Sequence, residues 1–378
     1  MTRYSVVDRR AKRSAANTIA KEAKSIGLAR EWADARRIDL DARLDSVELF
    51  THEESLDLVN WLQVGRATDK ARRERKVVNA DTTYSRVRHV CLYFGWRSEI
   101  AIHRISIASG RYQVASAKLE DWKRMIGELA RPGGSGKPKK GLVPELRARF
   151  LEVIDPKFAE NPFEICHRDR NYALLLAYYE LGLRRAEGLV LKGADLFLAG
   201  SKPRLYVYGR PDDPEDPRPD QPSVKTANRE LAVGPTLLAA LNTWLGARND
   251  KARYPGAKKT PFVFVSENGR PMANRTVYDL FVLIRESFPE FPRDFSPHTL
   301  RHDWNDRFSE LCDEERAAEQ PRHNSSDTRL TEAREMDLRN YLMGWKKKSQ
   351  RSATYTVRST ERQAQEISLR LQGKSVHG

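Results

Sequence analysis

The sequence predicts a mainly α-helical protein with one small antiparallel β-sheet. Apolar side chains recur at helical spacing over most of the 378 residues, for example in LFTHEESLDLVNWL and TYSRVRHVCLYFGW. One region differs: RLYVYGR alternates like a strand, PDDPEDPRPDQP is rich in turn residues, and VKTANRELAV resumes a strand. This order predicts a β-hairpin with a long loop, set between helical segments.

The composition is that of a folded basic protein, with 39% hydrophobic residues and a formal net charge of +15. Such a charge favours a polyanionic partner, and nucleic acid is the commonest one; a merely soluble basic surface is the alternative. The three cysteines, Cys91, Cys166 and Cys312, are far apart and odd in number. They predict no disulfide framework and no metal-binding cysteine pair, so we expect a reducing compartment.

The N-terminus is charged and lacks the apolar core of a signal peptide, and no apolar run is long enough to span a bilayer. These features predict a cytoplasmic protein without a membrane partner, associated with the nucleoid if DNA is the partner.

Four segments are predicted along the chain. Residues 1–75 form a helical extension of unknown role, in which Thr51 is expected to cap a helix with Glu54 as its capping-box partner. Residues 76–131 form a helical domain, 132–141 a linker, and 142–378 a larger domain that ends in a tail helix.

The second segment and the linker are strongly basic. Residues 76–140 hold 13 Lys and Arg against 5 Asp and Glu, a net charge of +8, and their aromatic residues fall at core spacing. The linker, RPGGSGKPKKG, resembles a phosphate-binding loop only superficially, because Arg131 and Pro138 occupy positions that such a loop fills with Gly and Ser or Thr. No ATP site is predicted. The candidate phosphate-contacting side chains are Arg86, Arg88, Arg97, Lys137, Lys139 and Lys140.

The first candidate for chemistry is the segment ELGLRRAEGLVL. A long apolar helix over about 169–181 is expected to end at Gly182, a natural C-cap, with Arg184 directly after it. Glu187 follows at the offset that faces Arg184 and holds its guanidinium. An ordinary helix break with a surface ion pair is the alternative.

The second candidate is the segment SPHTLRHDW. Ser296 is a good N-cap and Pro297 fits the first helical position, so a helix is predicted to begin here. His298 and Arg301 then share one face of the first turn, where the helix N-terminus already favours anions. A capped helix with solvated polar residues is the alternative, and His302 is expected to be structural.

Two further candidates are single residues in a suggestive context. Lys225 stands at the entry to the return strand of the hairpin, where a lysine is most often solvated. Tyr355 follows Gly344-Trp345 after a basic, polar turn. The acidic hairpin tip is expected to be a solvated loop, because no carboxylate cluster has metal-ligand spacing.

Taken in order, these residues resemble the tyrosine recombinase (phage integrase) family, whose pattern is GLR-x-x-E, a hairpin Lys, H-x-x-R, Gly-His/Trp and Tyr. The resemblance covers about 142–365, and more loosely 77–131 as a core-binding domain that closes with the catalytic domain as a clamp on DNA. It implies that Tyr355 is the nucleophile, that Arg184, Arg301, His298 and Trp345 surround the phosphate, and that Lys225 is the general acid. It also implies cleavage through a 3′-phosphotyrosyl bond without metal, ATP or any cofactor.

The resemblance further implies double-stranded DNA as the partner and a homotetramer on two DNA sites, with other recombinase subunits as further partners and a mobile element as the context. The sequence departs from the family pattern in its spacing, since ten residues rather than nine separate Trp345 from Tyr355. The hairpin tip (211–222) and the segment 309–337 are also longer than the family minimum. A type IB topoisomerase and a non-catalytic DNA-binding partner of a recombinase are the alternative functions.

Overall fold

The computed structural model describes residues 2–12, 14, 16–64, 77–133, 140–318 and 331–345. The chain divides into two compact units, residues 1–136 and residues 137–378. None of the described helices combines the length and the apolar content needed to cross a membrane.

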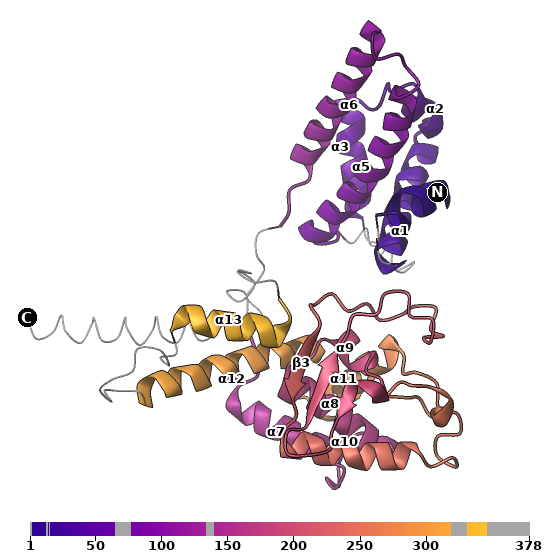
Figure 1. Ribbon diagram of the computed structural model, residues 1–378. Helices are drawn as coiled ribbons and strands as arrows, with labels where there is room; N and C mark the ends of the chain where they lie inside the picture. The colour runs from indigo at the N-terminus through magenta and orange to yellow at the C-terminus, as the bar shows by residue number, and fades with distance from the viewer. Residues whose placement is uncertain are drawn as a thin grey trace, which may run out of the picture. The chain divides into compact units, whose positions relative to one another are not determined.

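The first unit is entirely helical in the part that the structure describes. Its elements are a π-helix η1 (Tyr4–Arg10) and the helices α1 (Ala16–Ala35), α2 (Leu40–Asp45), α3 (His52–Gln63), α5 (Ala80–Ile102) and α6 (Gly110–Leu129). Helix α5 contacts each of the other α-helices, and α6 runs beside it (Figure 1). The predicted capping box is confirmed: Glu54 donates its backbone N–H to Thr51 Oγ1, and the Glu54 carboxylate accepts from the Thr51 N–H at 2.9 Å.

The core of this unit combines residues from both sides of the boundary predicted at residue 75. The ring of Phe50 lies 5.5 Å from that of Trp32, 5.5 Å from that of Phe94 and 6.0 Å from that of Trp122. All four rings are buried. Residues 1–64 and 77–130 therefore share one hydrophobic core, and the predicted boundary does not separate two cores.

The second unit contains helices around a small sheet. Its elements are α7 (Pro144–Ile154), η2 (Ile165–His167), α8 (Arg168–Leu181), α9 (Arg185–Leu189), η3 (Gly193–Asp195), β1 (Leu196–Phe197), β2 (Arg204–Val207), β3 (Arg229–Ala232), α10 (Pro235–Arg248), η4 (Ala257–Lys259), α11 (Asn274–Ser287), α12 (Pro297–Ala318) and α13 (Glu332–Met343). The strands are antiparallel in the order β1-β2-β3, with Leu205 opposite Leu231. The predicted fold class and long-loop hairpin are confirmed.

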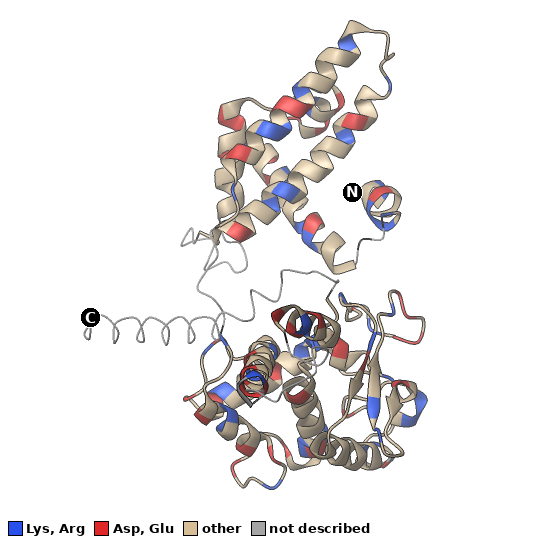
Figure 2. Cartoon of the chain, turned by 60° about the vertical axis from the view of Figure 1, so that its left-hand side comes forward, with Lys and Arg blue, Asp and Glu red and all other residues tan. Residues whose placement is uncertain are grey.

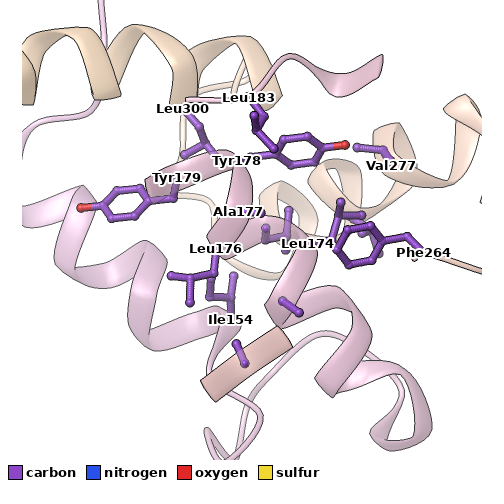
Figure 3. Packing of buried hydrophobic residues seen from close by; sticks show 14 of the residues in the cluster. Ile154, Leu174, Leu176, Ala177, Tyr178, Tyr179, Leu183, Phe264, Val277 and Leu300 are labelled. Carbon is purple, nitrogen blue, oxygen red and sulfur yellow. The ribbon is translucent and has the colours of Figure 1, made fainter. Parts of the chain in front are cut away.

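Helix α8 forms the centre of this unit. It contacts α7, α9, α10 and α12, and ten of its fourteen residues are buried, as expected for a helix whose residues 173–179 are all apolar or aromatic. Figure 3 shows Tyr178 and Tyr179 pointing to opposite sides of α8, among residues from neighbouring elements. Tyr178 Oη donates a hydrogen bond to the Arg185 carbonyl at 2.9 Å, which ties α9 to α8.

The hairpin tip corrects one prediction. The acidic tip was expected to be solvated, but Asp213 and Asp216 are buried. Lys192 Nζ lies 2.7 Å from Asp213 Oδ2, and Arg218 forms an ion pair with Asp216 at 2.7 Å. Arg218 also donates to the Met272 carbonyl at 2.6 Å. The prediction was wrong because Lys192 and the Met272 carbonyl, which hold the loop against the unit, come from segments distant in sequence, whereas Arg218 pairs with Asp216 within the tip.

The end of the linker is fixed to α12. Asp306 Oδ2 accepts the Gly141 N–H at 3.0 Å, and Asp303 Oδ1 accepts the Leu142 N–H at 3.1 Å. Arg147 Nε donates to the same Asp303 oxygen at 2.7 Å. Residues 134–139 of the predicted linker lie outside the described residues.

Gly182 ends α8 in the left-handed conformation, with φ of 58°, as predicted for a C-cap. A Cβ atom at this position would lie 2.8 Å from Trp304 Cγ and 2.9 Å from Met343 Cε. We expect Gly182→Ala to destabilise the second unit by about 2–5 kcal/mol, the sum of left-handed strain and overpacking. Urea denaturation measures this loss.

Gly246→Ala is the matched control. Gly246 lies in α10 and has no atom within 4 Å of an added Cβ. Since alanine favours a helix over glycine, this variant is expected to be neutral or more stable by up to about 1 kcal/mol. Equal losses in the two variants would show that the backbone conformation and contacts of Gly182 are not what stabilises this junction.

Candidate active site

A buried carboxylate, Glu187 of α9, organises the site. Its side chain is fully buried. Thr226 Oγ1 donates to Glu187 Oε1 at 2.6 Å, and Arg229 Nη2 donates to Oε2 at 2.8 Å. The backbone N–H of Arg184 donates to the same Oε2 at 2.9 Å. Glu187 thereby joins the start of α9 to the segment that leads into β3.

The ionisation of Glu187 depends on its cationic neighbours. Burial raises the pKa of a carboxyl, but the charge and hydrogen bond of Arg229, the charge of Arg301 and the hydrogen bond from Thr226 outweigh burial. Together they hold the pKa of Glu187 below its ordinary value, so the carboxylate is charged at neutral pH.

Arg184 occupies the N-cap position of α9, directly after the turn at Gly182 and Leu183. Its guanidinium lies 3.6 Å from Glu187 Oε1, and 24% of its side chain is exposed. The predicted pairing of Arg184 with Glu187 is present. Glu187 nevertheless makes its shorter ion pair with Arg229, at 2.8 Å, and the Arg184 side chain stays partly exposed at the surface of the site.

Arg301, in the first part of α12, is fully buried. Its Nη1 donates to the Gly182 carbonyl at 2.6 Å, and its Nη2 donates to the Met343 carbonyl at 2.8 Å. Nη1 also lies 3.8 Å from Glu187 Oε2. Arg301 thus satisfies the carbonyls at the ends of α8 and α13 and brings its charge to the same carboxylate.

His298 lies on α12 one turn before Arg301, as predicted from their spacing, and its side chain is exposed. The predicted start of this helix at Pro297 is confirmed, with Ser296 and Thr299 hydrogen-bonded to each other across the first turn. The ring of His298 lies 4.7 Å from that of buried His302, edge to face.

The turn after α13 meets the segment that holds Lys225. Gly344 is left-handed, with φ of 63°, and its carbonyl accepts the Ala227 N–H at 2.9 Å. Trp345 is buried, and the Arg301 guanidinium lies 5.6 Å from the centre of its ring. Lys225 is exposed, next to Thr226 on the same segment. The structure therefore brings the segment of Thr226 and Arg229 and the start of α12 to Glu187 of α9, and the end of α13 and the turn after it contact these two segments.

Tyr355 and the tail after it lie outside the described residues, which end at Trp345 in this part of the chain. Arg229 and Thr226 were not predicted. The sequence pattern could have indicated Arg229, because it alternates with Leu231 on the buried face of β3, where a charged residue requires a buried partner. No feature of the sequence indicated Thr226.

The basic side chains predicted for DNA contact in the first unit differ in their surroundings. Arg86 Nη1 donates to the Leu62 carbonyl at 2.6 Å and to the Val64 carbonyl at 3.0 Å, at the end of α3. Arg97 pairs with Asp41 and Asp45 of α2 at 2.9 and 2.7 Å. Figure 2 shows acidic residues interleaved with basic ones along these helices.

Arg88 and Lys140 are exposed, so phosphate contact stays a prediction for these two residues. Arg86 and Arg97 instead contact other residues of the first unit, as described above. Lys137 and Lys139 lie outside the described residues.

The site gathers basic side chains around one buried carboxylate. Two guanidiniums, an exposed imidazole and an exposed ammonium come from α9, α12 and the segment before β3, and a buried carboxylate orders the two guanidiniums. Such preorganised cations stabilise the charge that develops on a phosphoryl group.

Residues 155–328 match the model of the phage integrase family. This segment is therefore similar to the phage integrase family, the family of the tyrosine recombinases. No curated protein sequence matches the chain.

Solved structures of tyrosine recombinases resemble the chain at low identity. The crystal structure of XerA recombinase has 15% identity and a TM-score of 0.38, over 93% of this chain and 90% of that one. The Tn1549 transposon integrase in complex with transposon right end DNA has 16% identity and a TM-score of 0.46, over 82% and 80%. XerH site-specific recombinase bound to a palindromic difH substrate has 16% identity and a TM-score of 0.44, over 85% of both chains.

Proposed function

We propose that this protein cuts and rejoins DNA strands at specific sites, through a covalent 3′-phosphotyrosyl intermediate. The observation that carries the proposal is the meeting of Arg184 and Arg301 at one buried carboxylate, Glu187, although the two arginines are far apart in sequence. The family match over 155–328 includes both arginines.

In the proposed reaction, the two guanidiniums neutralise the non-bridging oxygens of the scissile phosphate. The Tyr355 oxygen forms a bond to phosphorus and passes its proton to His298, which lowers the barrier set by an ordinary phenol pKa of about 10. The bond from phosphorus to the 5′-oxygen breaks, and Lys225 protonates that oxygen. A 5′-hydroxyl from a partner strand then attacks the phosphotyrosine and reseals the strand.

This sequence of steps conserves the energy of the phosphodiester in the phosphotyrosyl bond, so it requires neither ATP nor a metal ion. Arg229 and Thr226 are positioning residues in this scheme, because they hold Glu187 rather than the phosphate. Trp345 supports Arg301 by packing against its guanidinium.

The substrate we propose is double-stranded DNA of a mobile element, bound by a homotetramer on two sites. The first unit, with the exposed Arg88, is the proposed core-binding domain, and the tail after Tyr355 the proposed link between subunits. The basic balance of the chain, +15, supports a DNA partner.

We expect Tyr355→Phe to abolish the covalent adduct, because phenylalanine has no oxygen to attack phosphorus. The measurement uses DNA fragments that carry candidate sites and a nick that traps the intermediate, followed by denaturing gels, in the presence of a chelator and without ATP. DNA binding in a gel-shift assay is expected to be unchanged.

Tyr341→Phe is the matched control, since Tyr341 is an exposed tyrosine of α13, and it is expected to keep the adduct. An adduct that persists in Tyr355→Phe would remove this residue as the nucleophile. Joining of strands from two separate duplexes supports recombination, whereas relaxation of a supercoil without such joining would indicate a topoisomerase instead.

A further inference from the structure

A second cluster of chemically reactive side chains lies at the other end of α8 from Gly182. Cys166 and His167 lie in η2 and Glu164 directly precedes it, and a carboxylate oxygen, the Cys166 Sγ and a ring nitrogen of His167 all lie within 4.8 Å of one another. The Glu267 carboxylate also lies 4.0 Å from His167 Nε2. The cluster contains a soft sulfur, a borderline nitrogen and hard oxygens.

Hydrogen bonds outside the cluster orient the His167 ring. Tyr254 Oη donates its single hydrogen to the Cys166 carbonyl at 2.8 Å, so the same oxygen must accept from His167 Nδ1, which lies 3.1 Å away. Tyr254 is buried and packs edge to face on Trp244 at 5.0 Å, which fixes its position. Nδ1 of the imidazole therefore carries a hydrogen.

The opposite nitrogen, Nε2, faces the two carboxylates, with Glu164 Oε2 at 3.8 Å and Glu267 Oε2 at 4.0 Å. In a neutral ring Nε2 presents a lone pair toward these negative oxygens. In a metal-ligating histidine, one ring nitrogen binds the metal, and the other usually donates a hydrogen bond to a fixed acceptor that orients the ring.

We propose that His167 Nε2, Cys166 Sγ and the carboxylates of Glu164 and Glu267 bind a zinc ion. Zinc accepts imidazole, thiolate and carboxylate ligands together, whereas magnesium and calcium favour oxygen alone. Ligand bonds of about 2.0–2.3 Å place neighbouring donors of a tetrahedral site about 3.3–3.8 Å apart. The separations here are wider, at 3.8 and 4.0 Å from Nε2 to the two carboxylates and up to 4.8 Å within the cluster, and the exposed side chains of Glu164 and Glu267, at 79% and 71%, are able to close them.

The bound ion joins the segment before α8 to the loop after Val265, which are distant in sequence and here share one group of ligands. Its thiolate and two carboxylates carry three negative charges, so a divalent cation neutralises most of the charge at this surface. The site does not depend on the proposed recombination, because its ligands take no part in that reaction.

Cobalt(II) titration of the full-length protein tests the proposal, because a thiolate bound to cobalt gives a charge-transfer absorption in the near ultraviolet. We expect this band in the wild type and its loss in Cys166→Ser, a change at an exposed side chain. Cys312→Ser, at a buried cysteine, is the matched control and is expected to keep the band.

Competition with a chromophoric chelator then measures zinc affinity. Glu267→Gln and His167→Gln are expected to weaken zinc binding at least tenfold, and zinc is expected to raise the melting temperature of the wild type but not of Cys166→Ser. Absence of the band from the wild type, or its persistence in Cys166→Ser, would overturn the site.

Discussion

Glu187→Gln is expected to destabilise the second unit by about 3–5 kcal/mol, because it leaves buried arginines without their counter-ion. The side chains of Arg229 and Arg301 are 1% and 0% exposed, so water does not replace the lost carboxylate. Glutamine nearly conserves volume, which separates the loss of charge from cavity formation. Urea denaturation, followed by a signal from each unit, is expected to show the loss in the second unit only.

Glu230→Gln on β3 is the matched control. Glu230 pairs with Arg204 at 3.3 Å, but both side chains are more than a third exposed, at 38% and 40%. Exposed ion pairs of this kind contribute about 0–1 kcal/mol. A loss at Glu187 as small as that at Glu230 would show that the buried cluster does not depend on its carboxylate.

The same pair of proteins gives a pH test. Because the folded-state pKa of Glu187 is lowered, its carboxylate contributes stability above the unfolded pKa of about 4.3 and loses that contribution as the pH falls through the folded value. The stability difference between the wild type and Glu187→Gln is therefore expected to shrink below about pH 4. A difference that stays constant into the acid range would contradict the role of the charge.

Local patterns in the sequence were sufficient to predict the helices and to place several site residues on them. The stop at Gly182 and the start at Pro297 depend on backbone conformation and capping, which one short segment determines by itself. Those two boundaries place Arg184 and Arg301 at helix ends, where their guanidiniums reach Glu187. The fold class could be predicted from the spacing of apolar residues, because this spacing is also a property of each short segment by itself.

Contacts between distant segments were beyond the sequence. The partners of Glu187 include Thr226 and Arg229, which no spacing rule joins to α9. The acidic tip was assigned to solvent because no spacing rule joins Asp213 to Lys192, or Arg218 to the Met272 carbonyl. Ion pairs of this kind are set by the packing of the whole unit, so a local pattern does not contain them.

Arg184→Ala is expected to slow strand cleavage by about 10²–10³-fold while leaving the fold nearly unchanged. Removal of one preorganised donor to a developing negative charge costs a reaction about this factor. Arg184 suits the test better than Arg301, because it is partly exposed and its ion pair to Glu187 is 3.6 Å long, whereas Arg301 is buried against two carbonyls. Single-turnover cleavage of nicked DNA measures the rate, and urea denaturation measures stability.

Two further variants separate a specific effect from a change in general charge. Arg185→Ala removes an exposed neighbouring cation and is expected to change the cleavage rate by less than about threefold, since its contribution is screened by solvent. Arg184→Lys keeps the charge but loses the planar fork of donors, so we expect a rate between those of alanine and the wild type. Equal losses in Arg184→Ala and Arg185→Ala would assign the effect to DNA attraction rather than to the scissile phosphate, and would remove Arg184 from the proposed catalytic set.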